Sequence, residues 1–309
     1  MNRFSLRAVL RAWLIGAALL AANAVAVAQP AYDRAAAIAA DLRLGAARNV
    51  HVAAHRADWR EHPENSLPAI ASALALGCDI IEIDVRRTKD GRFVIIHDLT
   101  LDRTTTGKGN VADFTLAELR QLRLVDANAH ATAELIPTLE EALNAVRGRA
   151  VVNLDKSFDH LAEIYAEVAR LSALDFALFS VNEPRAHYET RHPGLLSRMK
   201  FMLVLNSKRA DFAAIIADYL EKQPPLILQM TFAAETDPIL AFVPRARAAG
   251  IRVWMNSLWP EHNAGHHDDR ALTDPAGSYG WIVAQGATVI QTDRPRLLLS
   301  YLATQGLRR

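Results

Sequence analysis

The sequence predicts an α/β domain built as a closed (β/α)8 barrel, a TIM barrel, with a small insertion after the second strand. Two observations carry this prediction. Eight short runs rich in Val and Ile alternate mostly with helical patterns, and the interiors of these runs are almost continuously apolar. Parallel strands need helical crossovers, and strands covered on both faces lose the alternating pattern. A doubly wound open sheet is the alternative, although no glycine-rich turn follows the first run.

Each element is placed by its local pattern, apolar runs giving strands and a helical period giving helices. The predicted barrel strands are Val50–Ala54, Asp79–Val85, Ala150–Asp155, Phe176–Val181, Phe201–Leu205, Leu226–Met230, Ile251–Asn256 and Thr288–Gln291. A first helix is predicted around Arg34–Leu44, and the crossover helices include Ser66–Leu76, Thr138–Val146, His160–Ser172, Arg209–Glu221 and Ile239–Ala249.

Two long connections interrupt this alternation. The first, Arg86 to Pro137, contains an extra strand at Phe93–His97 and a polar loop at Thr104–Asn110. The second, Ser257 to Ser278, carries several His and Asp residues between positions 262 and 269. Connections this long are usually functional when they are ordered. Because the second lacks regular metal-ligand spacing, we expect a solvated, flexible lid there in preference to a second ion site.

Composition excludes several classes of protein. The chain has 309 residues, 51% of them hydrophobic, and a formal net charge of +1. These values exclude a disordered chain and give no basic excess for binding nucleic acid. The single cysteine, Cys78, lies beside an apolar run, so a buried and inert thiol is expected.

The start of the chain predicts a secretory leader. Arginines precede an apolar run at Ala12–Ala22, and small residues follow at Ala26–Ala28. We expect a signal peptide over residues 1–28 and one domain over residues 29–309, with an insertion at about 86–137 and no stable membrane span in the mature chain. The protein is then exported to the periplasm or secreted. An uncleaved anchor is the alternative.

Polar side chains gather where the predicted strands end, which is where barrels carry their chemistry. The first strand is followed by His55 and Arg56, the second contains Glu82 and Asp84, and the extra strand ends in His97. Glu82 and Asp84 are two residues apart, so both carboxylates lie on one face of their strand. Among neighbouring isoleucines they repel each other unless a cation binds between them. Oxygen ligands favour Ca²⁺ or Mg²⁺ over zinc.

A structural alternative stays open for these charges, because Glu82 and Asp84 can also pair with Arg56 and Lys156 as a buried ion cluster. The combination of residue types nevertheless suits a phosphodiester. A metal and an arginine bind anionic phosphoryl oxygens, while imidazoles transfer protons.

Several ordered motifs are similar to those of the glycerophosphodiester phosphodiesterase family. The similarity runs from about Val50 to the last strand. The motifs are His55-Arg56, Pro63–Ser66, Gly77–Val85, Thr88–Gly91, His97-Asp98, Leu101–Thr105, Ile136–Glu141 and Gln291–Pro295. This resemblance implies a (β/α)8 barrel with a small insertion after the second strand.

The resemblance also implies roles for individual residues. It makes His55 and His97 the general acid–base pair, Glu82 and Asp84 metal ligands, and Arg56 a phosphate contact. We expect His55 to be the base and His97 the acid.

The third strand departs from the family pattern. Asn153-Leu154-Asp155 matches the first three positions of an Asn-x-Glu-x-Lys strand, which makes Asp155 the third metal ligand. Lys156 follows at once, so strand alternation turns it away from Asp155 unless the strand bends; it is kept as a substrate contact. Ala57 replaces a family glycine beside the phosphate site. Trp254 resembles a family position that lines the pocket.

The expected function is metal-dependent hydrolysis of a small glycerophosphodiester to glycerol phosphate and an alcohol. The cofactor is a divalent cation, Ca²⁺ or Mg²⁺. Water and a neighbouring substrate hydroxyl both stay open as the nucleophile, and the oligomeric state is not predicted. One alternative is a phospholipase D-like hydrolase of intact lipids, which needs an apolar loop near the barrel mouth. The other is a non-catalytic binding protein of the cell envelope.

Overall fold

The computed structural model describes residues 33–44 and 49–308. The predicted signal peptide, residues 1–28, lies outside this described part. Within residues 33–44 and 49–308, none of the helices combines the length and the apolar character that a membrane span requires.

Eight parallel strands close into a barrel. In neighbour order the sheet runs β1, β9, β8, β7, β6, β5, β4 and β2, and β2 pairs back onto β1 through Ala53 opposite Ile80. The strands are β1 His51–Ala54, β2 Ile80–Arg87, β4 Val151–Asp155, β5 Ala177–Val181, β6 Phe201–Asn206, β7 Ile227–Thr231, β8 Arg252–Asn256 and β9 Val289–Thr292. The prediction of a (β/α)8 barrel is confirmed, and the return pairing of β2 excludes the open sheet.

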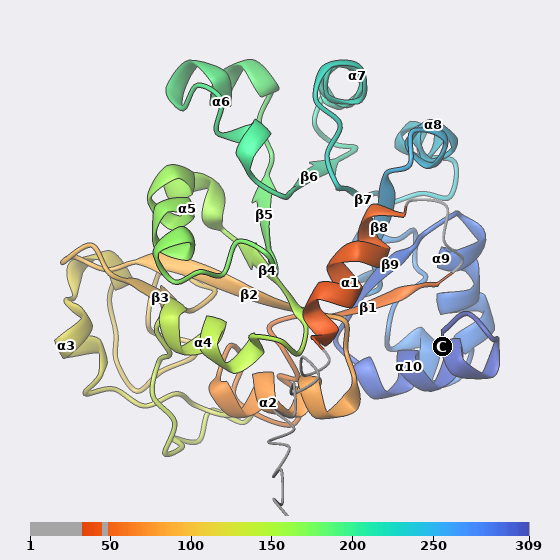
Figure 1. The fold of residues 1–309 in the computed structure, drawn as a ribbon. Coiled ribbons are helices and arrows are strands. Elements are labelled where there is room, and N and C mark those ends of the chain that lie inside the picture. Colours follow the sequence, from red (N-terminus) through yellow and green to blue (C-terminus); the bar gives the residue numbers. More distant parts are fainter. Residues whose placement is uncertain (1–32, 45–48, 309) are drawn as a thin grey trace, which may run out of the picture. The chain divides into compact units, whose positions relative to one another are not determined.

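Helices connect most of these strands around the outside of the barrel (Figure 1). They are α2 Leu67–Leu76, α4 Leu139–Val146, α5 Leu161–Arg170, α6 Arg185–Arg191, α7 Phe212–Lys222, α8 Val243–Ala248 and α9 Trp281–Ala284. Two further helices do not connect strands: α1 Arg34–Arg43 precedes β1, and α10 Pro295–Thr304 follows β9. Ser66 caps α2 by accepting a hydrogen bond from the Ala69 amide, and Thr138 begins α4 with a reciprocal capping box to Glu141. The crossover predicted over Ile239–Ala249 divides into a short 3₁₀ helix, Pro238–Phe242, followed by α8.

The segment between β2 and α4 folds back on the barrel as a small layer of its own. Strand β3, Phe93–Ile95, pairs antiparallel with the end of β2, with Ile95 opposite Val85. A separate apolar cluster covers this hairpin, and the short helix α3, Leu116–Leu119, contributes to it. The Ile96 amide donates to the Asp84 carbonyl at 3.0 Å. This bond fixes the residues after β3 beside the carboxyl end of β2.

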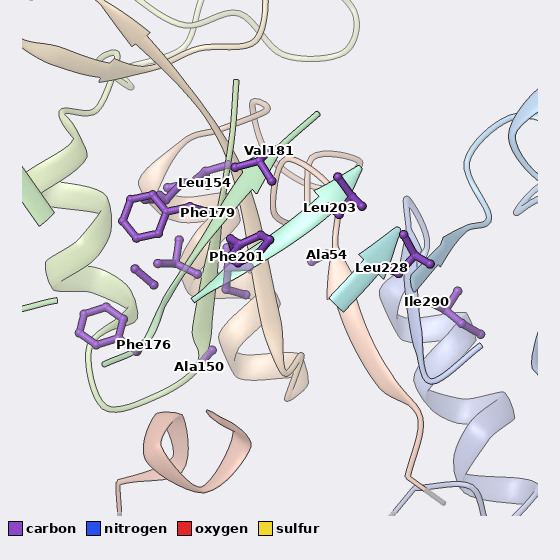
Figure 2. Close-up of a cluster of buried hydrophobic side chains, with 14 of the residues drawn as sticks. Ala54, Ala150, Leu154, Phe176, Phe179, Val181, Phe201, Leu203, Leu228 and Ile290 are labelled. Atoms are coloured by element: carbon purple, nitrogen blue, oxygen red, sulfur yellow. The ribbon is translucent and has the colours of Figure 1, made fainter. Parts of the chain in front are cut away.

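Two apolar layers hold the barrel together. Outward-facing strand residues pack under the surrounding helices, and Figure 2 shows several of them, including Leu154, Phe179 and Leu203. A second cluster fills the barrel interior and includes Ile80, Leu178 and Trp254. Helix α1 adds Ile38, Ala39 and Leu42 to this interior cluster, so it closes the amino-terminal end of the barrel. The opposite end is left for the functional side chains.

Charged residues fasten the closed end. The buried carboxylate of Asp79 accepts from the Val52 amide at 3.0 Å and pairs with Arg34 at 2.9 Å and with Arg308. These contacts tie α1 and the end of the chain to the start of β2. Burial favours the neutral form of Asp79, yet its contacts with His51 and Arg308 hold its pKa at about 2.

Candidate active site

Three carboxylates meet at the carboxyl end of β2 and β4. Glu82 and Asp84 share one face of β2, and Asp155 is the register partner of Asp84 on β4. Oxygens of the three side chains lie within 4.8 Å of one another. Glu82 and Asp84 are buried, at 2% and 1% exposure. Burial, followed by the charges of Asp84 and Asp155, raises the pKa of Glu82 well above its ordinary value.

This donor set fits a divalent cation. Like charges this close and this deeply buried repel one another, and a bound cation removes the repulsion. The donors are all oxygen atoms, which are the ligands that Ca²⁺ and Mg²⁺ prefer. The Asn65 amide holds Asp84 Oδ2 at 2.8 Å, so one oxygen of that carboxylate already has a fixed orientation. Glu82, Asp84 and Asp155 would therefore hold the ion.

Lys156 contradicts the expectation from strand alternation. Its backbone is left-handed, with φ of 58°, so the strand ends and the side chain turns back. Its Nζ lies 3.1 Å from Asp155 Oδ2. Burial lowers the pKa of Lys156, but the charges of Asp155, Asp84 and Glu82 outweigh burial and raise it above its ordinary value. The ammonium group therefore stays charged beside the carboxylate cluster.

The turn after β1 carries Arg56 to the same cluster. Arg56 and Ala57 both have positive φ, at 49° and 63°, so Ala57 adopts the conformation for which glycine is better suited. The Arg56 amide donates to Glu82 Oε2 at 2.7 Å, and its Nη1 donates to both Glu64 oxygens at 3.2 Å. Among the described residues, the buried Arg56 Nε has no hydrogen-bond partner; it lies 3.9 Å from Asp84 Oδ2. A donor of this kind is available to an anionic ligand.

A chain of ion pairs connects Arg56 with His97. Arg103 donates to both oxygens of Glu64, at 2.6 and 2.9 Å, and to both oxygens of Asp98, at 2.8 and 2.9 Å. Asp98 Oδ1 in turn lies 2.7 Å from His97 Nδ1. The hydrogen bonds from Arg103 and then from His97 hold the pKa of Asp98 far below its ordinary value. The His97 ring is thus anchored to an ionised carboxylate.

His55 is held from the other end of the chain. Its Nδ1 lies 2.7 Å from Asp293 Oδ1, directly after β9, and both residues are buried. The Trp59 indole donates to the same oxygen at 2.6 Å. Trp259, in the connection after β8, lies edge-on to the His55 ring at 5.5 Å and is 40% exposed.

Trp254 does not take the predicted place at the substrate. It is fully buried, at 0% exposure, and belongs to the interior cluster that α1 closes. Its indole donates to Asn256 Oδ1 at 2.9 Å, and Gln229 donates to the same oxygen at 3.0 Å. The prediction of a substrate contact is corrected: Trp254 is a core residue that orients Asn256.

The connection after β8 also differs from its prediction. The expected solvated lid is packed into the fold, with His266 stacked on Trp281 at 3.8 Å and hydrogen-bonded to Glu235 at 2.8 Å. Asp268 is buried at 1% exposure and accepts from the hydroxyls of Ser257, Tyr279 and Thr292. Burial raises its pKa to about 6, against the effect of these donors. This segment packs against the site through Trp259 and Asp268.

The model of the glycerophosphoryl diester phosphodiesterase family matches residues 55–220, more than half of the chain. The chain belongs to this family. The match begins at His55 and includes the carboxylate cluster, Lys156 and His97. A second model, of a domain of unknown function, matches residues 201–302, which carry Trp259, Asp268 and Asp293.

Members of this family are similar to the chain in sequence and in structure. A glycerophosphodiester phosphodiesterase of Bacillus altitudinis is 31% identical over 199 residues, which cover 64% of this chain and 76% of that protein. One of Caldanaerobacter subterraneus is 47% identical over 96 residues, 31% of this chain and 40% of that protein. The matched part thus spans less than half of the second relative.

The solved structures agree on the fold. A glycerophosphoryl diester phosphodiesterase of Parabacteroides distasonis superposes with a TM-score of 0.70 at 24% identity, covering 86% of this chain and 92% of that one. An Oleispira antarctica phosphodiesterase in complex with the product sn-glycerol-3-phosphate superposes with a TM-score of 0.61 at 23% identity, covering 82% of this chain and 96% of that one.

Several contacts at this site leave no clear signal in the sequence. Asp293 lies within the Gln291–Pro295 motif, but it is so far from His55 along the chain that no local pattern predicts their contact. Arg103 likewise lay within a motif, and its role as the bridge between Glu64 and Asp98 follows only from the folded insertion. Trp259 had one signal, a large aromatic residue within a connection after a strand.

Proposed function

We propose that this protein is a metal-dependent phosphodiesterase that hydrolyses glycerophosphodiesters to glycerol phosphate and an alcohol. One observation carries the proposal: the three-carboxylate cluster and Arg56, whose Nε has no partner in the described part of the chain, are connected to His97 through Glu64, Arg103 and Asp98. Family membership supports the reaction class. The names of the relatives, and the product bound by the Oleispira protein, support the substrate.

The side chains divide the work by charge. Arg56 and Lys156 are placed to bind the phosphoryl oxygens, because both cations lie against the carboxylate cluster. Glu82, Asp84 and Asp155 would hold a divalent cation, which when bound would supply further electrostatic stabilisation of charge on those oxygens. The cluster by itself would repel an anionic substrate, so the two cations and the ion together make the site attractive to a phosphodiester.

The two imidazoles transfer protons. His55 removes a proton from the attacking hydroxyl, and His97 donates one to the departing alkoxide, which is a poor leaving group without it. Asp98 accepts the hydrogen bond from His97 Nδ1, so Nε2 is the nitrogen available for that transfer.

The direct test is product identification. The purified protein, loaded with Ca²⁺ or Mg²⁺, is incubated with a panel of glycerophosphodiesters, and the products are identified by ³¹P NMR. We expect glycerol phosphate and the free alcohol, with activity abolished by chelator and restored by metal. Absence of any diester hydrolysis in the metal-loaded protein contradicts the proposal.

The roles of the two histidines are separated by the leaving group. His55→Ala and His97→Ala should each lose at least about 10²-fold in kcat on an alkyl diester while still binding metal. A nitrophenyl diester needs no proton on its leaving group, so it should rescue His97→Ala and not His55→Ala. His130→Ala, in the exposed part of the insertion, is the matched control. Rescue of His55→Ala instead reverses the assignment.

A second candidate is hydrolysis of a lipid diester that keeps an acyl chain. Two of the exposed large apolar side chains favour it, Leu99 at 67% exposure two residues after His97 and Trp259 at 40% exposure beside His55. The same product assay, run on a lysophospholipid below and above its critical micelle concentration, decides between them. Faster release from micelles than from glycerophosphocholine favours the lipid.

We further propose that the protein acts outside the cytoplasm, after removal of residues 1–28. The arrangement of charged, apolar and small residues at the start of the sequence supports export. Cell fractionation followed by amino-terminal sequencing tests this. A mature chain starting at Gln29 in the periplasm or medium is expected, and a full-length chain in the cytoplasm contradicts it.

A further inference from the structure

The imidazole of His55 shares its carboxylate partner with an indole. Asp293 Oδ1 lies 2.7 Å from His55 Nδ1 and 2.6 Å from Trp59 Nε1. His55 is 7% exposed and Asp293 is 3% exposed, so water does not compete strongly for these bonds. His55 and Trp59 both lie in the loop after the first strand, whereas Asp293 follows the last strand.

This arrangement determines which ring nitrogen carries the proton. An indole N–H only donates, so Asp293 Oδ1 is an acceptor toward Trp59. Burial favours the neutral form of Asp293, yet the bonds from His55 and Trp59 hold its pKa below its ordinary value. An ionised carboxylate only accepts, and His55 Nδ1 is therefore a donor. In the neutral ring Nε2 then has the free lone pair.

Asp293 is itself fixed by a second buried carboxylate. The Asp293 amide donates to Asp268 Oδ2 at 2.7 Å. Asp268 Oδ1 accepts from Ser257 at 2.8 Å and from Thr292 at 2.6 Å, which ties the connection after β8 to the end of β9. Among the described residues Asp268 has no hydrogen bond to His55, and its connection to the ring runs through the Asp293 amide.

We propose that Asp293 is the positioning residue for His55: it holds the ring in the Nδ1–H form with Nε2 aimed at the reaction, and the segment 201–302 completes the site through it. The proposal rests on the function proposed above. It assigns a role to the segment that matches a domain of unknown function, since Asp293, Asp268 and Trp259 all lie there. Asp293 is not one of the three carboxylates that would hold the cation.

The competing explanation is that the contact between Asp293 and His55 only stabilises the fold. A substitution of Asp293 distinguishes this structural role from the positioning role. Asp293→Asn keeps the size of the side chain but places an amide N–H where an acceptor is needed, so the Nδ1–H form of His55 is no longer favoured. We expect kcat to fall on the order of 10²–10⁴-fold, as for loss of the orienting carboxylate in a catalytic triad. KM and the thermal shift caused by Ca²⁺ should stay within about twofold of wild type.

Two further variants make the kinetic test specific. Trp59→Phe removes one donor from the shared oxygen and leaves the bond to His55, so its kcat should fall by less than about tenfold. Asp269→Asn is the matched control, because this exposed carboxylate pairs with Arg60 and Arg294 next to Asp293 without reaching His55. Its kcat should match wild type within about twofold. An Asp293→Asn variant equal to this control overturns the proposal.

A readout independent of activity keeps the inference separate from the proposed reaction. Long-range ¹H–¹⁵N correlation spectra of the labelled, metal-loaded protein report the tautomer of each neutral histidine ring, and His55→Gln identifies the signals of His55. We expect Nδ1–H in wild type and a shift toward Nε2–H in Asp293→Asn. A wild-type ring protonated at Nε2 overturns the proposal even if Asp293→Asn fails to fold. If the tautomer is as expected but no diester is hydrolysed, only the proposed function fails.

Discussion

Asp84 on β2 lies directly opposite Asp155 on β4 in the parallel register of the barrel. Neighbouring register partners carry their side chains at the same level, and Glu82 lies on the same face one pleat below Asp84. The backbone pairing of two strands thus brings three acidic side chains together before any ligand is considered. The consequences for stability and for metal binding can be measured separately.

Removing one charge from this cluster should stabilise the metal-free protein. We expect Glu82→Gln to raise Tm in chelator by roughly 2–4 °C, the shift that about 1 kcal/mol gives in a large domain, because repulsion from Asp84 and Asp155 is relieved. Differential scanning fluorimetry in chelator checks this, with the exposed Glu221→Gln on α7 as control. A variant less stable than wild type in chelator contradicts the repulsion argument.

Although Glu82→Gln should raise Tm in chelator, it should reduce the increase in Tm that metal causes. A ligand at 100 times its Kd stabilises a native protein by about 2.7 kcal/mol, so Ca²⁺ or Mg²⁺ should raise the Tm of wild type. Glu82→Gln should show a smaller rise at the same concentration, because one charged ligand is lost. Equal metal-induced shifts in both proteins would place the ion elsewhere.

Lys156 should affect cation and substrate in opposite directions. Its ammonium lies 3.1 Å from Asp155, so Lys156→Met removes a positive charge that repels a bound cation and attracts a phosphate. We expect metal affinity to rise several-fold while KM for the diester increases. Calorimetric metal titration and steady-state kinetics measure the two effects. Lys200→Met, at a cation remote from the cluster, is the control, and loss of metal affinity in Lys156→Met is the contrary result.

The two tryptophans near the end of β8 should separate stability from substrate binding. Trp254→Phe removes the indole donor to the buried Asn256 oxygen, so we expect a loss of about 1–3 kcal/mol in unfolding free energy with KM unchanged. Trp259→Ala, at an exposed ring beside His55, should change stability by less than about 0.5 kcal/mol and raise KM. Urea unfolding and kinetics on both variants test the pair. A raised KM in Trp254→Phe alone would restore its predicted role.

Acid should weaken the closed end of the barrel through Asp79. Its pKa of about 2 in the folded protein lies below the ordinary value of 3.8, so the ionised form stabilises the fold above about pH 4. This contribution is lost as the pH falls toward 2, and about 1 kcal/mol of it disappears between pH 5 and pH 3. Urea unfolding at both pH values should show that Asp79→Asn loses less stability than wild type over this interval. An equal loss in both proteins would mean that Asp79 titrates normally.

The barrel could be predicted because its signals are local. Each strand is a run of apolar residues, and the ends of the run mark the ends of the strand. The structure places all eight strands within a residue or two of their predicted bounds. Glu82 and Asp84 were located for the same reason, since strand periodicity alone puts them on one face. The convergence of Asp155 followed from the rule that parallel strands end at one edge.

The rest of the site depended on facts that no local pattern contains. The left-handed backbone at Lys156 reverses the direction that alternation assigns to its side chain. Trp254 was predicted at the mouth of the barrel but packs in its interior. The sequence does not show how far α1 fills the barrel, and that determines where the packed interior ends. The bond between His55 and Asp293 joins the first strand to the residue after the last, and only closure of the barrel brings them together.

Because helix α1 covers one end of the barrel, ligands reach the site from the other end. Ile38, Ala39 and Leu42 pack into the amino-terminal end of the barrel and close it. In the proposed reaction, the charged product therefore leaves through the same carboxyl-terminal opening by which the substrate enters. Substrate cannot enter while product still occupies this opening. If Arg56 and Lys156 bind phosphate as proposed, retained glycerol phosphate would block the next substrate molecule, and turnover would slow as the product accumulates.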